Sequence, residues 1–167
     1  VAASGQPDGI LRITCTRGPG PRGYRAPAVD VPFCVMAFSP LPVPAAAPWR
    51  AVVARHPVMP HPILSRVKHT SALPRIVAFQ EAEIHGADEV IALTIAGFVS
   101  EGLAANVFWR RGDDVYTPDV EGSGCLPGIG RHAVIRWARQ EGYRVVAGCY
   151  PLESLLEADE VFFTNAV

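Results

Sequence analysis

Lysine is almost absent from this chain, whose 167 residues include fourteen arginines but only one lysine, Lys68. An arginine guanidinium has a pKa of about 12 and therefore stays protonated at neutral pH. Arginine can then neither form a Schiff base nor shuttle a proton. Because arginine serves every other cationic position, we interpret Lys68 as a site that requires an amine. A solvated surface lysine is the alternative interpretation.

Cysteine is also scarce, and the few cysteines are not grouped. They are Cys15, Cys34, Cys125 and Cys149. The sequence contains no C-x-x-C pair and no histidine at a metal-ligand spacing, which argues against both a zinc site and a disulfide framework. We therefore expect buried free thiols and no metal site.

Neither sign of charge dominates, because 15 basic and 16 acidic residues are scattered along the chain and the formal net charge is −1. This balance argues against binding to nucleic acid or to an anionic membrane surface. The longest uncharged run, residues 31–49, is interrupted by five prolines, and the first residues given do not show a basic segment followed by an apolar run. We expect a cytoplasmic protein that acts on a small molecule.

The spacing of apolar residues predicts strands and helices in mixed order. Strands are predicted at residues 11–16, 31–38, 50–55, 89–94, 105–109, 115–117, 144–147 and 160–164. Helices are predicted at 71–85, with Ser71 as the N-cap, at 129–141 and at 152–156. Because the order shows no strict βαβ repeat, the sequence predicts an α+β fold.

A proline-rich stretch suggests a domain boundary. Residues 39–48 contain four prolines, which favour an extended connection over a helix or a central strand. We predict one unit at 1–40, a linker at 41–49 and a second unit at 50–167. Since the chain begins with Val1 and ends at Val167 directly after a predicted strand, we expect it to be a piece of a longer protein.

One glycine-rich loop formally matches a dinucleotide-binding fingerprint. Gly18, Gly20 and Gly23 satisfy G-x-G-x-x-G after a predicted strand. However, Pro19 and Pro21 remove two backbone donors from the would-be phosphate cradle, and no helix opens behind it. We interpret this segment as a turn.

Three other places have side chains or backbone suited to a ligand. Arg22 and Tyr24 in the same loop could bind a carboxylate, Glu101 precedes a run of small residues, and the helix predicted at 129–141 begins with free N–H groups that attract anions. Each also has a plain structural explanation as a solvated loop or helix end.

Taken together, these residues and six ordered segments resemble a known family. The segments are "RGPGPRGY", "VKHTSALPRIV", "ADEVIAL", "EGLAANVFWRRGDDVYTP", "LPGIGR" and "ADEVFFTNA". They are similar to the fold-type IV pyridoxal-phosphate enzymes, which include branched-chain and D-amino-acid aminotransferases, and most of all to the 4-amino-4-deoxychorismate lyases of that family. The resemblance implies the α+β fold of these enzymes, with residues 1–40 ending a small domain and 50–167 forming most of a large cofactor-binding domain.

The resemblance also implies roles for individual residues. Lys68 would be the catalytic lysine that forms a Schiff base with pyridoxal 5'-phosphate, Glu101 would pair with the pyridine nitrogen, and Arg22 and Tyr24 would lie near the substrate. The remaining residues implied at the cofactor are Leu103, Ala104, Ala105, Asn106, Ile129, Gly130, Asn165 and Ala166. The chain departs from the family pattern at Ser71, where asparagine is usual, and at Gly130, where threonine or methionine is usual.

The implied activity is a lyase reaction that gives 4-aminobenzoate and pyruvate in folate biosynthesis, in a cytoplasmic homodimer. Two alternatives stay open on the sequence. One is an aminotransferase on the same fold, and the other is a non-catalytic remnant.

Overall fold

The computed structural model describes residues 5, 8–43 and 47–166 of the chain. The chain divides into two compact units, one formed by Val1–Ala45 with Val167 and the other by Ala46–Ala166. Residues 44–46, in the middle of the predicted linker, lie outside the described residues.

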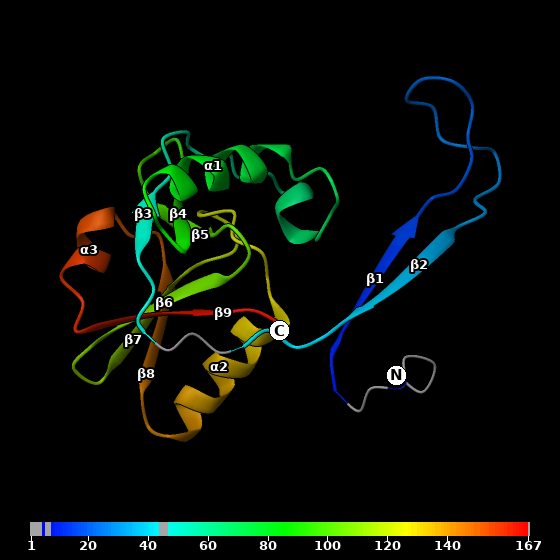
Figure 1. Cartoon of the computed structure of the whole chain (residues 1–167). Helices are drawn as coiled ribbons and strands as arrows, with labels where there is room; N and C mark the ends of the chain where they lie inside the picture. Colours follow the sequence, from blue (N-terminus) through cyan, green and yellow to red (C-terminus); the bar gives the residue numbers. More distant parts are fainter. Residues whose placement is uncertain (1–4, 6–7, 44–46, 167) are drawn as a thin grey trace. The chain divides into compact units, whose positions relative to one another are not determined.

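The first unit is built on an antiparallel pair of strands, β1 (Ile10–Thr16) and β2 (Phe33–Ser39), which form the ribbon in blue and cyan in Figure 1. Cys15 and Cys34 lie directly opposite each other in this pair, and their sulfur atoms are 2.6 Å apart. Both are exposed, as is Cys149. The expectation that all the cysteines are buried is therefore wrong, and only Cys125 fits it.

The second unit contains two sheets. The three-stranded sheet has the order β3-β4-β5, with β3 (Ala51–Val53) parallel to β4 (Glu89–Leu93) and β4 antiparallel to β5 (Val99–Gly102). The four-stranded sheet has the order β8-β7-β6-β9 and is formed by β6 (Asn106–Arg111), β7 (Asp114–Pro118), β8 (Arg144–Gly148) and β9 (Glu160–Thr164). Only β7 and β8 are parallel within this sheet. The mixture of strands and helices confirms the predicted α+β class.

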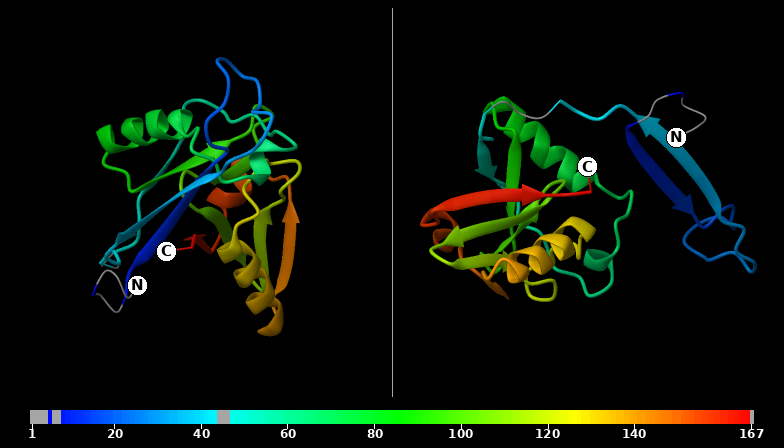
Figure 2. Two further views of the ribbon diagram at one scale, coloured as in Figure 1. Left: turned by 90° about the vertical axis from the view of Figure 1, so that its right-hand side faces the viewer. Right: turned by 90° about the horizontal axis from the view of Figure 1, so that it is seen from below.

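Helices connect these strands. They are the 3-10 helix η2 (Leu64–Arg66), α1 (Leu73–Ile84), α2 (Ile129–Gln140) and α3 (Leu152–Leu156). The two views of Figure 2 show α2 alongside the four-stranded sheet, where it packs next to β8. None of the helices in the described part of the chain is long and apolar enough to span a membrane.

The core of the second unit joins the two sheets. Ile91 and Val99 from the three-stranded sheet pack with Val107 and Trp109 of β6, and Leu155 of α3 closes the cluster. Burial of such side chains contributes roughly 1.5–3 kcal/mol each. The ends of β5 and β6 are thereby held on a rigid base.

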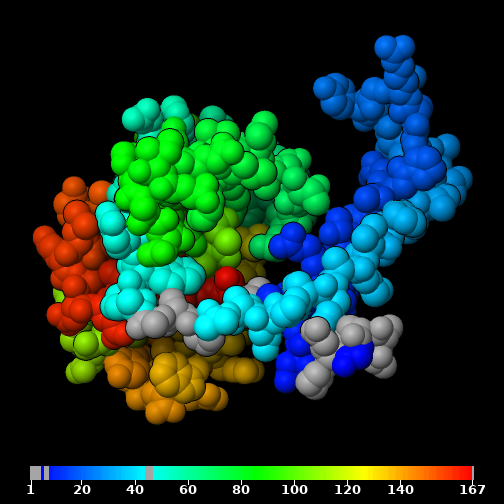
Figure 3. Space-filling model, viewed as in Figure 1, coloured from blue at the N-terminus to red at the C-terminus, as the bar shows by residue number. Residues whose placement is uncertain are grey.

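Helix α1 begins later than predicted and packs through small side chains. Its N-cap is Ala72, so the prediction that Ser71 caps the helix is wrong. Ala82 is buried beside Val90, whereas the larger residues Leu73 and Ile84 are exposed. Because small side chains allow close approach, α1 lies against β4 through its alanines, and its outer side forms part of the surface at the top of Figure 3.

Candidate active site

Glu101 is the buried acidic residue around which the candidate site is organised. It lies on β5, its side chain is 6% exposed, and three groups donate hydrogen bonds to it. Arg75 Nη2 lies 2.5 Å from Oε1, and the backbone N–H of Leu126 donates to Oε2 at 2.9 Å. A buried carboxylate is stable only with such partners. These contacts within the chain therefore hold the Glu101 side chain in one orientation.

The turn after Glu101 is fixed by two further groups. Glu89 Oε1 accepts hydrogen bonds from the backbone N–H groups of Val90, at 2.8 Å, and Leu103, at 3.0 Å. Arg75 Nη1 donates to the Leu103 carbonyl at 2.6 Å. Together these contacts hold residues 103–105, between β5 and β6, as a defined turn next to the carboxylate.

Asn106, the first residue of β6, links this turn to the start of α2. Its Nδ2 donates to the Leu126 carbonyl at 2.8 Å and to Glu101 Oε2 at 3.4 Å. A Cβ on Gly128 would stand 2.3 Å from Asn106 Oδ1, so the loop before α2 approaches Asn106 closely. Asn106, Glu101 and Leu126 thus form one buried polar group.

The N-terminus of α2 adjoins the end of β9. Gly128 is the N-cap, and no side chain caps the first N–H groups of the helix. A Cβ on Gly130 would stand 2.5 Å from the Asn165 carbonyl oxygen and 2.7 Å from Thr164 Oγ1. Backbone N–H groups at a helix N-terminus bind anions. The residues expected to hold a phosphate, Ile129, Gly130, Asn165 and Ala166, therefore lie in adjacent segments.

Lys68 lies in the irregular segment between η2 and α1 and is exposed. It forms no hydrogen bond or ion pair with any other described residue. Its segment leads into the first turn of α1, from which Arg75 reaches Glu101. The amine is thus unengaged and available for a ligand.

Arg22 and Tyr24 lie in the loop that joins β1 and β2, and both are exposed. They belong to the first unit, while the other candidate residues belong to the second. Their role near a substrate stays a prediction.

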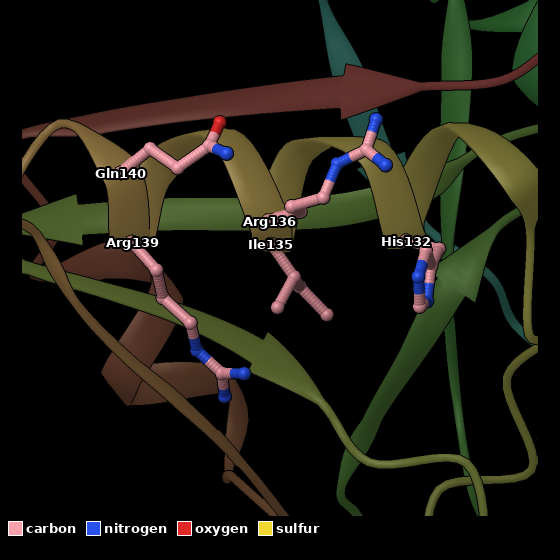
Figure 4. Close-up of a pocket in the computed structure, with 5 residues that line it drawn as sticks. All are labelled: His132, Ile135, Arg136, Arg139 and Gln140. Atoms are coloured by element: carbon pink, nitrogen blue, oxygen red, sulfur yellow. The ribbon is translucent and has the colours of Figure 1, made fainter.

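Two surface hollows of about 400 Å³ occur in the second unit, and neither contains a predicted site residue. The first is lined entirely by α2, and Figure 4 shows its residues, which are His132, Ile135, Arg136, Arg139 and Gln140. The second is lined by Pro60, His61, Pro62, Arg66, Val120 and Glu121. The polar network of Glu101 is the better candidate site because it combines a buried charge with an anion-binding helix end. Among the described residues, no cluster of three potential metal ligands occurs.

The sequence pattern does not point to two of the groups that organise the site, Arg75 and Glu89. Each acts on a residue distant in the chain, Glu101 for Arg75 and Leu103 for Glu89. The only sequence signal was the charge of Glu89 at the start of the apolar strand "EVIAL". For Arg75 a single sequence offers no signal.

The amino-acid sequence matches a family of proteins and individual relatives within it. The sequence model of the family described as Amino-transferase class IV matches residues 1–167. An aminodeoxychorismate lyase from Vibrio harveyi is 31% identical over 164 residues, which make up 94% of this chain and 59% of the relative.

Solved structures share the fold. The 4-amino-4-deoxychorismate lyase from Pseudomonas aeruginosa superposes with a TM-score of 0.85 at 28% identity, over 99% of this chain and 62% of that one. The branched-chain amino acid aminotransferase from Escherichia coli superposes with a TM-score of 0.82 at 30% identity, over 93% of this chain and 51% of that one. The chain spans less than two thirds of the length of each of these three proteins.

Proposed function

The chain belongs to the class IV aminotransferase family, and from this premise we propose that the protein is a pyridoxal-phosphate lyase that converts 4-amino-4-deoxychorismate into 4-aminobenzoate and pyruvate. We further propose that it works as a cytoplasmic homodimer on this small-molecule substrate. The observation that carries the proposal is the buried carboxylate of Glu101, linked through Leu126 to the uncapped N-terminus of α2.

The residues present suit pyridoxal 5'-phosphate. Glu101 would accept a hydrogen bond from the pyridine nitrogen, and the backbone N–H groups of Ile129 and Gly130 would bind the phosphate, with Asn165 and Ala166 beside them. Leu103, Ala104 and Ala105 would line the ring, and Asn106, which follows them in the chain, donates a hydrogen bond to the Leu126 carbonyl. The cofactor, when bound, supplies a conjugated ring that takes up the electron pair left after a proton is removed from the substrate.

Lys68 would bind the cofactor covalently and act as the general base. Its Nζ would remove the proton from the substrate carbon that bears the amino group. A neutral amine can accept a proton in this step, whereas a guanidinium retains its own proton and cannot. The absence of any competing contact to Lys68 in the described part of the chain supports this role.

The reaction balances without a co-reactant. Loss of the proton from C4 and cleavage of the neighbouring carbon–oxygen bond release enolpyruvate, which becomes pyruvate, while the ring becomes aromatic. Arg22 would bind a substrate carboxylate, and Tyr24 would lie beside it.

The decisive experiment measures pyruvate from 4-amino-4-deoxychorismate with no keto acid present, by coupling to lactate dehydrogenase. Stoichiometric pyruvate and 4-aminobenzoate are expected. If instead the protein turns over only with a branched-chain amino acid and 2-oxoglutarate, it is an aminotransferase, the activity that the name of the similar Escherichia coli protein states. A protein that takes up no cofactor and shows neither activity would be a non-catalytic member of the family.

A further inference from the structure

Arg75 contacts two separate parts of the candidate site, and we propose that it is the positioning residue that holds Glu101 and the following turn in place for the cofactor. The inference rests on the proposed function, because it concerns how the carboxylate of that function is arranged. Arg75 itself would touch neither the substrate nor the reacting atoms.

The geometry uses both terminal nitrogens of one guanidinium. Nη2 lies 2.5 Å from Glu101 Oε1, and Nη1 lies 2.6 Å from the Leu103 carbonyl oxygen. Because the guanidinium is planar and rigid, its two donors fix the distance between the carboxylate and the turn. A flexible cation or a neutral amide could satisfy one of these acceptors but not both in the same way.

Charge gives a second reason. The Glu101 side chain is 6% exposed, and its other two donors, the Leu126 N–H and the Asn106 amide, are neutral. Arg75 is its only cationic partner in the part of the chain that the structure describes. Leaving a buried carboxylate without a counter-charge is strongly unfavourable. Arg75 therefore supplies the counter-charge of the carboxylate that would accept a hydrogen bond from the ring nitrogen.

The carboxylate still has room for that nitrogen. Two carboxylate oxygens offer about four acceptor positions, and the described residues occupy three of them. The Arg75 side chain is 46% exposed, whereas that of Glu101 is 6% exposed, so the ion pair joins a buried carboxylate to a partly solvated guanidinium.

Arg75 also lies close to Lys68 along the chain. Arg75 lies in the first turn of α1, directly after the irregular segment that carries Lys68. Its bonds to Glu101 and Leu103 anchor the start of α1 to the site. Arg75 thus attaches the helix that follows the Lys68 segment to the strand that carries Glu101.

The test compares cofactor affinity in four proteins: wild type, Arg75→Gln, Arg75→Lys and the control Arg66→Gln. Arg66 pairs with Glu121 at 2.9 Å on the surface, and its side chain is 54% exposed, so it matches Arg75 in exposure but lies outside the Glu101 network. Dissociation constants for pyridoxal phosphate are measured by absorbance titration. We expect Arg75→Gln to weaken binding by about 10- to 100-fold, as loss of a supporting contact commonly does. Arg75→Lys should recover part of the loss, because it keeps the charge, and Arg66→Gln should bind as wild type does.

A double-mutant cycle shows whether Arg75 acts through Glu101. If it does, Arg75→Gln should change the affinity little once Glu101→Gln is present, because the ion pair is already gone. An equal loss in both backgrounds, or an Arg75→Gln affinity equal to that of Arg66→Gln, would overturn this inference alone. If Arg75→Gln fails to fold by circular dichroism, the comparison of Arg75→Lys in the two backgrounds decides. No cofactor uptake by the wild-type protein would overturn the proposed function as well.

Discussion

Gly130 lies against the backbone of Asn165, with only 2.5 Å between the place a Cβ would occupy and the Asn165 carbonyl oxygen. The first turn of α2 and the end of β9 thus come together at a residue that has no side chain. The family pattern has threonine or methionine at this position, so in this chain the Asn165 backbone occupies space that a side chain would need. The close approach places the end of β9 beside the N-terminus of α2, where we propose that the phosphate binds.

Gly130→Ala should therefore destabilise the protein. A glycine-to-alanine change inside a helix is ordinarily stabilising by about 0.5–1 kcal/mol, but here the new methyl group must push the Asn165 backbone away. We expect a loss of about 1–3 kcal/mol in the free energy of unfolding, together with weaker cofactor binding. Urea denaturation and absorbance titration measure the two effects.

Gly20→Ala is the control, because an added Cβ there would meet nothing closer than 3.5 Å. It should leave both quantities unchanged. A Gly130→Ala protein as stable as wild type would show that α2 and β9 are farther apart than the structure has them.

Lys68→Ala should abolish the chemistry and leave the fold intact. Lys68 is exposed and forms no hydrogen bond or ion pair with the other described residues, so stability should change by less than about 0.5 kcal/mol. Pyruvate release should fall by at least about 100-fold, because the general base is removed. Borohydride reduction of the protein with pyridoxal phosphate, followed by peptide mass analysis, should place the label on Lys68 in wild type and on no residue in the variant. A label at the N-terminal amine alone would contradict the assignment.

Asn106→Ala should affect both stability and cofactor affinity. The Asn106 amide supports the Leu126 carbonyl at 2.8 Å, and the Leu126 N–H in turn holds Glu101. Losing this bond should lower the free energy of unfolding by about 1 kcal/mol and weaken pyridoxal phosphate binding. Thr117→Val removes a comparable buried bond, from Oγ1 to the Val107 carbonyl, away from Glu101. It should lower stability and leave cofactor affinity unchanged; equal affinities in the two variants would exclude a role for Asn106 at the site.

Cys15 and Cys34 should form a disulfide when the protein meets a small oxidised disulfide such as oxidised glutathione. One thiolate would attack the oxidised disulfide to form a mixed disulfide and release one small thiol, and the other cysteine would then attack the mixed disulfide and release the second, so that two electrons pass to the oxidant. Their hydrogen bond raises the pKa of the Cys34 thiol, so the reaction should be faster at alkaline pH. Non-reducing peptide mass analysis should find this link in wild type and a mixed disulfide in Cys34→Ser. Buried Cys125 should stay unmodified, and persistence of both free thiols in wild type would contradict the register of β1 and β2.

Residue types and their order predict much of this molecule. Local apolar patterns identify β9 at Glu160–Thr164 and α3 at Leu152–Leu156 with the correct bounds, because each is a short run whose pattern is set by its own residues. Lys68 and Glu101 can be singled out without knowledge of their contacts, because their side chains suit the chemistry and the segments that contain them resemble those of a known family.

The contacts between distant segments could not be predicted from the sequence. The pattern predicts no strand at Val99–Gly102, because Ser100 and Glu101 are polar and their burial depends on Arg75 and Leu126. Likewise the register that places Cys15 opposite Cys34 depends on how a long loop closes, which no local rule fixes.

The ion pair between Asp114 and Arg144 should make stability depend on pH in acid. Hydrogen bonds from Arg144, and a further one from Tyr116, hold the pKa of the Asp114 carboxyl below its usual value, although burial opposes this. Since the folded-state pKa lies below the unfolded one, the stabilisation is complete above about pH 4 and disappears as the pH falls through the folded-state value. The free energy of unfolding of Asp114→Asn should therefore fall less steeply than that of wild type below about pH 4.

The neighbouring residue offers the matched control for this dependence. Asp113 forms no ion pair among the described residues, so Asp113→Asn should keep the steep wild-type profile. Arg144→Gln should flatten the profile as Asp114→Asn does, because either change removes the same pair. Both effects should shrink in about 1 M salt, since the pair is partly exposed and is screened. Identical acid profiles for wild type and Asp114→Asn, measured by urea denaturation at a series of pH values, would show that Arg144 does not hold the carboxylate in solution.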